Sequence, residues 1–129
     1  MIQIIPSPNL EAKDIKFFRG ICKISIAEIR DASKNGTPIR EIEIFKTEWD
    51  EEKIELVDIY RHYASNDYAA YLIKEVNEFG LDEILTPEKL RNRIEHWRGI
   101  ELETEMATEL ELGEITHPEQ FNPTTKEWT

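Results

Sequence analysis

The sequence predicts an α+β fold, with a small and mainly antiparallel sheet that carries helices on one face. Two observations support this class. Apolar residues switch between strand-like and helix-like spacing in the order β-α-α-β-α-β over residues 1–80. A further portion at 86–115 has helical spacing and many glutamates. We therefore expect a compact sheet with a helical, acidic extension at its C-terminal side.

The chain of 129 residues has a suitable length for one domain, and about two thirds of its surface can be buried on folding. We treat 1–129 as a single domain. Within it we expect a core at 1–80, the helical extension at 86–115 and a loose tail at 116–129.

The first half of the core shows clear element boundaries. Residues 1–6 form a predicted strand that ends at a proline. Residues 10–21 have helical spacing, and a second helix is predicted at 25–36. Ser25 and Glu28 give this second helix the S-x-x-E pattern of a capping box, and an Asn-Gly pair ends it.

The second half of the core alternates strand, helix and strand. Isoleucine and glutamate alternate within 38–45, which indicates a half-exposed strand. Residues 50–65 form a predicted helix with acids in its first turn, where the helix dipole favours anions. A strand is predicted at 69–76, which is rich in β-branched and aromatic residues. The expected inward-facing stripe of the helix is Ile54, Val57, Tyr60 (or Arg61) and Ala64.

The extension begins with a strong helix signal. Thr86 is a predicted N-cap, Pro87 stands at the first helical position, and Gly99 marks the expected end. Residues 100–112 fit two patterns, because apolar residues alternate as in a strand and also recur every fourth residue. Their five glutamates favour a helix, since glutamate is a poor strand former.

One stretch of the predicted helix pair, "IKFFRGICKISIAEIR", resembles a run in the C-terminal domain of the bacterial ribosomal stalk protein. The matching residues are Ile15, Lys16, Arg19, Glu28 and Arg30, whereas the family's two loop glycines are replaced by Lys23 and Ser25. The resemblance covers about residues 10–76 and implies a βααβαβ domain that recruits translation factors. It would place the docking surface on Ile15, Lys16, Arg19 and Arg30.

Charge is unevenly distributed along this chain, whose formal net charge is −11. Residues 10–40 hold seven Lys/Arg against four acids, whereas 99–129 hold one Lys against eight Glu. Phosphate binding needs clustered cations, so this balance disfavours nucleic acid as a ligand. It favours a basic partner, most simply a basic protein.

The sequence offers little for catalysis, and we expect no enzyme activity, cofactor or metal. It has no phosphate-binding glycine loop and no nucleophile motif. His62, His96 and His117 lack metal-ligand spacing, and Cys22 is the single cysteine. Without a disulfide, a signal-like N-terminus or an apolar span of about 20 residues, a cytoplasmic protein that binds no membrane is expected.

Small acidic chains of this kind, with "SIAEIRDASKNGTPIREIEIF" followed by an acidic helix, are similar to immunity proteins of bacterial polymorphic toxin and contact-dependent growth inhibition systems. The resemblance implies an inhibitor that neutralises a toxin, often a basic nuclease, by direct contact. Alternatives are a ribosome-associated module that docks through the basic helix pair 15–34, and a phage-type or structural self-assembling subunit. The predicted partner-binding residues are Trp49, Glu51, Glu52, Glu55, Asp58, Trp97, Glu101, Glu103, Glu105, Glu109 and Glu111.

Overall fold

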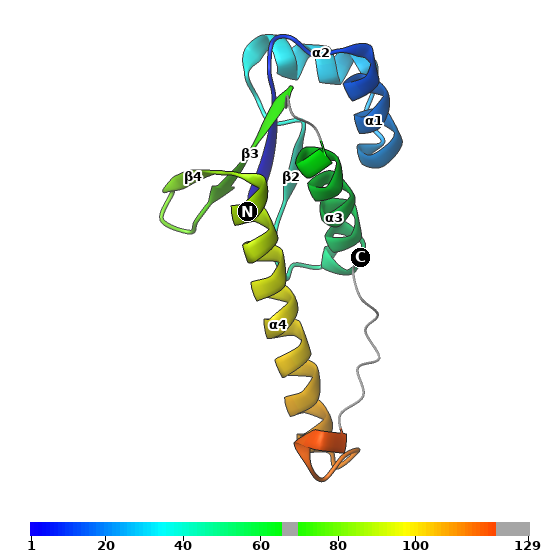
Figure 1. Cartoon of the computed structure of the whole chain (residues 1–129), viewed down its shortest axis with the longest axis vertical. Helices are drawn as coiled ribbons and strands as arrows, with labels where there is room; N and C mark the ends of the chain where they lie inside the picture. Colours follow the sequence, from blue (N-terminus) through cyan, green and yellow to red (C-terminus); the bar gives the residue numbers. More distant parts are fainter. Residues whose placement is uncertain (66–69, 121–129) are drawn as a thin grey trace.

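The computed structural model describes residues 1–65 and 70–120, which form one four-stranded antiparallel sheet and four α-helices (Figure 1). The strands lie in the order β2-β1-β3-β4 and comprise β1 (Ile2–Pro6), β2 (Arg40–Ile42), β3 (Tyr71–Val76) and β4 (Asp82–Leu85). The helices are α1 (Ala12–Cys22), α2 (Ile26–Asn35), α3 (Trp49–Ser65) and α4 (Pro87–Leu112), followed by the short 3-10 helix η1 (Pro118–Gln120). The predicted α+β class is confirmed.

The sheet buries one face against the helices. Ile4 of β1 pairs with Arg40 of β2 on one side and with Ile73 of β3 on the other. Ile2 and Ile4 are fully buried, whereas Gln3 between them is only half-buried. Because side chains alternate across a strand, this pattern assigns the even positions of β1 to the core.

All four α-helices contribute to one hydrophobic core. Each fully buried aliphatic or aromatic side chain stabilises the fold by roughly 1.5–3 kcal/mol relative to its exposed state. The sheet contributes Ile2, Ile4, Ile42, Ile73 and Leu85, and the helices contribute Phe18, Ile29, Leu56, Ile59 and Leu90.

The inward face of α3 differs from the predicted stripe. Ile54 is 52% exposed, and Ala64 is also exposed, so only Val57 of that stripe is fully buried. The helix instead turns Leu56, Ile59 and Tyr63 inward. The physical reason is that Glu52 and Lys53, in the first half of α3, are buried and form ion pairs with Arg40 and Glu101. Their burial sets the rotation of the helix.

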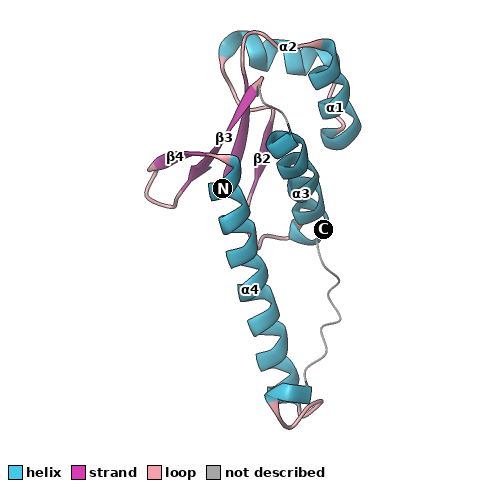
Figure 2. Cartoon of the chain, in the orientation of Figure 1, coloured by secondary structure: helices cyan, strands magenta, loops and turns pink. Residues whose placement is uncertain are grey.

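Helix α4 is continuous, and the predicted end at Gly99 is wrong. The helix begins at the predicted N-cap, where the Thr86 hydroxyl accepts a hydrogen bond from Lys89 N, and it ends at Gly113 in the left-handed conformation. A glycine inside a helix costs about 1 kcal/mol relative to alanine but does not break the backbone hydrogen-bond ladder. The expectation that 100–112 is helical is confirmed, and Figure 2 shows this half running past the sheet.

Two strands also differ from expectation. β2 has only three residues instead of the predicted eight, and Phe45, with a positive φ of 61°, lies in the turn that follows it. β4 was not predicted. It pairs with β3 in a hairpin closed by a turn at Asn77–Leu81.

Candidate partner-binding surface

The structure brings the acidic helix α3 against the acidic second half of α4. Trp49 Nε1 donates to Glu101 Oε2 at 3.1 Å, and Lys53 Nζ lies 2.6 Å from Glu101 Oε1. The Trp49 and Trp97 rings meet edge to face with their centroids 6.1 Å apart. Since both indoles and the Lys53 side chain are buried, Trp49, Trp97 and Glu101 join the two helices and do not face a partner.

Two further predicted site residues, Glu52 and Glu55, belong to an internal ion cluster. Arg40 of β2 binds Glu55 through Nε at 2.8 Å and through its terminal nitrogen at 3.0 Å, and it reaches Glu52 at 3.2 Å. Burial raises the pKa of Glu52, although Arg40 opposes the rise. These carboxylates fix α3 to β2, so they are not offered to a partner.

Cys22 lies beside this ion cluster. Burial, and then the charge and a hydrogen bond of the Glu55 carboxylate, together raise the pKa of its thiol to about 12, although Arg40 opposes the rise. A thiol needs a lowered pKa to act as a nucleophile. This environment therefore works against reactivity at Cys22.

The remaining predicted site residues lie nearer to solvent. Glu51, Glu103 and Glu111 are exposed, and none forms an ion pair with the residues that the structure describes. Asp58 is exposed and lies 3.8 Å from Arg61. Glu105 and Glu109 are half-buried.

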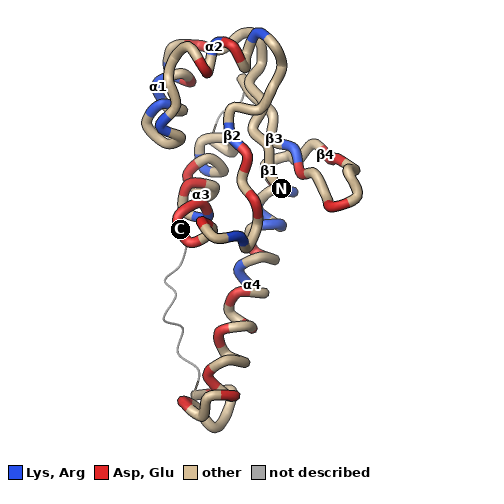
Figure 3. Tube along the Cα trace, turned by 180° about the vertical axis from the view of Figure 1, so that it is seen from behind, with Lys and Arg blue, Asp and Glu red and all other residues tan. Residues whose placement is uncertain are grey.

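We call residues 99–112 of α4 the acidic arm. It projects from the body of the molecule, and the view from behind shows acidic residues following one another along it (Figures 1 and 3). The arm holds five glutamates and no Lys or Arg. One carboxylate oxygen, Glu109 Oε2, is buried and receives no hydrogen bond within the described part of the chain.

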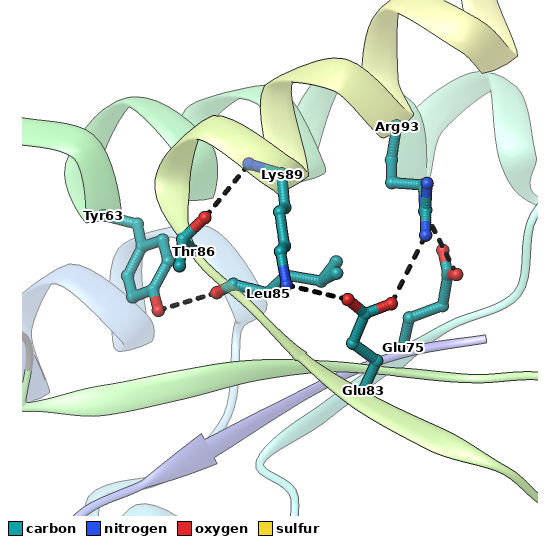
Figure 4. A network of polar contacts seen from close by, with 7 residues as sticks. All are labelled: Tyr63, Glu75, Glu83, Leu85, Thr86, Lys89 and Arg93. Atoms are coloured by element: carbon teal, nitrogen blue, oxygen red, sulfur yellow. Dashed lines mark hydrogen bonds and ion pairs between the residues drawn. The ribbon is translucent and has the colours of Figure 1, made fainter.

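A polar network fixes the other end of α4 to the β3–β4 hairpin (Figure 4). Arg93 contacts Glu75 at 3.2 Å and Glu83 at 3.4 Å, and Lys89 contacts Glu83 at 2.9 Å. The Tyr63 hydroxyl donates to Leu85 O at 3.0 Å and connects α3 to the same corner. The direction of the acidic arm is thus set by contacts at the first turns of its own helix.

The hairpin presents apolar residues that the sequence analysis missed. Phe79 is 81% exposed, and Leu81 and Ile84 are also exposed. The Asn77 side chain accepts hydrogen bonds from Phe79 N and Leu81 N, so the turn holds these residues in place. The Asn-x-x-Gly spacing at 77–80 was the available turn signal.

The predicted helix pair carries a groove on its outer surface. Two adjoining hollows of about 590 and 290 Å³ share Ala12, Ile15 and Arg30 as lining residues. Leu10 and Ile26 add apolar lining at the two ends. Four exposed cations surround this basic groove, and none of them forms an ion pair within residues 1–65 and 70–120: Lys16, Arg19, Arg30 and Lys34.

No group of three or more His, Cys, Asp or Glu side chains in the described residues is placed to hold a metal ion. Within the same ranges, no helix has the length and apolar character needed to cross a bilayer.

Comparison with protein-family models, curated proteins and solved structures finds no match to this chain.

Proposed function

We propose that this chain is a non-enzymatic cytoplasmic inhibitor, an immunity protein that neutralises a cognate bacterial toxin by direct contact. The toxin is expected to be a basic protein, and a nuclease with a cationic substrate groove suits this description. The surface that we assign to the contact is the acidic arm together with Glu51 at the neighbouring start of α3.

The observation that carries the proposal is the placement of acids against the helix dipole. The C-terminal end of a helix favours cations, and an unfavourable charge there costs about 0.3–1 kcal/mol. The last turn of α4 has no basic residue and contains Glu109 and Glu111. This placement of acids weakens an isolated helix. A cationic partner at this end would turn the unfavourable energy of these acids into a favourable one.

Repulsion along the arm supports the same conclusion. Glu101, Glu105 and Glu109 follow at four-residue spacing, where each like-charge pair destabilises a helix by about 0.2–0.5 kcal/mol. Lys53 compensates Glu101 within the molecule, and the buried Glu109 Oε2 has no donor in the described structure. A partner with Lys or Arg side chains would relieve both the repulsion and the missing hydrogen bond.

Acids on a projecting arm also accelerate association. Complementary charge raises association rates from about 10⁵–10⁶ towards 10⁸–10⁹ M⁻¹s⁻¹ at low salt, which suits an inhibitor that must capture a toxin before it acts. The exposed Phe79 and Leu81 of the hairpin are further candidates for apolar contact with such a partner.

The test uses the toxic C-terminal domain of the protein encoded immediately upstream of this chain. The chain should bind that purified domain and suppress its toxicity. Glu103→Lys with Glu111→Lys should lower the association rate about tenfold or more, because the arm then repels the basic domain. Asp31→Lys with Glu95→Lys makes the same change in net charge at exposed positions outside the arm and should leave binding intact. Absence of a toxic upstream product, or equal binding by both variants, would contradict the proposal.

A second candidate function is favoured by the basic groove. An apolar groove lined by cations suits docking of an acidic segment of a translation factor, as the resemblance to the stalk-protein domain implies. Lys16→Glu with Arg30→Glu should then abolish binding to purified translation elongation factors and leave the toxin complex unchanged.

A further inference from the structure

The molecule carries two complementary surfaces at its opposite ends. The basic groove lies on α1 and α2, and the acidic arm projects beyond the opposite end of the sheet (Figure 1). Because the arm is a rigid continuation of α4 that leads away from α1 and α2, it does not reach the groove of its own chain. Contact between the two surfaces therefore requires two copies of the chain.

We infer that the acidic arm of one copy docks in the basic groove of a second copy, so that the chain self-associates head to tail. The inference does not depend on the toxin, since both surfaces belong to this chain. It gives the groove an occupant that the structure itself displays.

Shape favours this occupant. The exposed side of the arm carries apolar residues at its two ends, Ile100 and Leu112, with the small side chains of Thr104, Ala107 and Thr108 between them. Small residues allow a helix to approach its partner closely. The groove offers Leu10, Ala12, Ile15 and Ile26 as an apolar lining of matching character.

Charge favours the same arrangement. Glu103 and Glu111 lie on the exposed side of the arm, about 12 Å apart along the helix axis at 1.5 Å per residue. Lys16 and Arg19 extend from one wall of the groove, and Arg30 and Lys34 extend from the other. Cations on both walls can contact acids on a helix that lies between them.

Net charge limits the strength of the contact. Two chains of charge −11 repel each other at long range, but the Debye length is about 8 Å at physiological salt, so repulsion between distant charges is screened while contacts in the groove persist. We therefore expect weak association, with a Kd on the order of 10–100 µM. It should weaken at high salt, where the contacts themselves are screened, and at very low salt, where the net charges dominate.

The test is sedimentation velocity on the full chain over a concentration series. Wild type should associate reversibly. Lys16→Glu/Arg30→Glu and Glu103→Lys/Glu111→Lys should each remain monomeric, because each variant places like charges on its own groove and arm. An equimolar mixture of the two variants should associate again, since every junction between unlike copies then joins opposite charges.

Two controls separate this effect from a change in net charge. Glu88→Lys/Glu95→Lys and Arg61→Glu/Arg91→Glu alter net charge by the same amounts at exposed positions outside both surfaces, and each should associate like wild type. Far-ultraviolet circular dichroism and thermal unfolding establish that all variants are folded. A wild type that stays monomeric at every concentration and salt would overturn the inference. Association of either surface variant by itself would also overturn it. So would an equimolar mixture of the two variants that fails to associate.

Discussion

At the scale of single residues, the polar groups near the core are largely matched to partners. Arg40 neutralises Glu52 and Glu55 where β2 meets α3, and Glu101 neutralises Lys53 where α3 meets α4. Buried charges need such pairing because the cost of desolvation otherwise exceeds the gain from burial. Two titratable groups with shifted pKa values, Cys22 and His62, give direct predictions.

The first prediction concerns Cys22. Its thiol has a pKa raised to about 12 by burial and by Glu55, against an ordinary value of 9.0. A rise of about three units reduces the thiolate fraction at pH 8 roughly a thousandfold. Alkylation by iodoacetamide, followed by mass spectrometry, should therefore be at least about 100-fold slower in the native chain than in urea. Equal rates in both states would show that the thiol is not shielded.

The second prediction concerns pH dependence at His62. The ring stacks on Phe17 with centroids 3.7 Å apart, and Nδ1 lies 2.7 Å from the Tyr71 hydroxyl oxygen. Burial lowers the pKa of His62, Asp14 opposes this change and Lys13 adds to it. The unfolded state thus binds the proton more readily than the folded state. The contribution of His62 to stability is complete above its ordinary pKa of about 6.5 and declines as the pH falls below that value.

Urea unfolding at a series of pH values from about 7.5 to 5.5 tests this expectation. Wild type should lose stability towards the acid end, and His62→Gln should show a flatter profile because it cannot take up the proton. His96→Gln, which changes an exposed histidine of α4, should keep the wild-type slope. Parallel profiles for all three proteins would exclude His62 as the source.

At the scale of elements, the contact of Glu101 with α3 fixes the start of the acidic arm to the body of the molecule. Glu101 accepts from both Trp49 and Lys53, so its removal leaves a buried lysine and an indole N–H with fewer partners. Glu101→Ala should lower the free energy of unfolding by about 2–3 kcal/mol in urea titration. Glu103→Ala, two residues away and exposed, should change it by less than about 0.5 kcal/mol. Similar losses for both variants would refute the structural role of Glu101.

The continuity of α4 gives a prediction with opposite signs at two glycines. Gly99 lies within the helix, and a β-carbon there would meet no atom within 4 Å. Gly99→Ala should therefore raise the free energy of unfolding by about 0.5–1 kcal/mol. Gly113 has a φ of +76°, so Gly113→Ala should lower it by about 1 kcal/mol. Thermal unfolding of both variants provides the check, and a destabilising Gly99→Ala would argue for a helix that ends at residue 99.

Local signals in the sequence predicted these elements where capping or turn chemistry was explicit. Ser25 caps α2 by accepting from Glu28 N, Gly36 ends that helix in the left-handed conformation, and Thr86 caps α4. The inward face of α3 could not be predicted in the same way. Its rotation depends on ion pairs with β2 and α4, which are distant in sequence. β4 is a short strand with two acids, and it exists because it pairs with β3 and anchors α4.

At the scale of the whole molecule, the net charge of −11 should affect stability. Repulsion between like charges is stronger in the compact state than in the unfolded chain, and salt screens it. The urea midpoint should therefore rise as sodium chloride increases from about 10 to 150 mM. Glu103→Lys/Glu111→Lys should show a shallower rise, because it removes part of the repulsion. A midpoint that is independent of salt in both proteins would contradict this account.

The sequence also predicted the sign and position of the charged regions, but not which acids remain available. All eleven predicted partner-binding residues lie on or beside α3 and α4 as expected from their spacing. Five of them, Trp49, Glu52, Glu55, Trp97 and Glu101, are engaged inside the molecule. Composition counts a carboxylate in the same way whether it faces solvent or a buried lysine, so only the packing separates the two groups.

The uninterrupted α4 has one more consequence. By holding the glutamates of the arm far from the cations of α1 and α2, it gives the chain a permanent electric dipole moment along its long axis. Such a molecule experiences a torque in the field of any cationic surface. It would rotate its acidic end forward before contact, so a larger fraction of collisions would occur in a productive orientation.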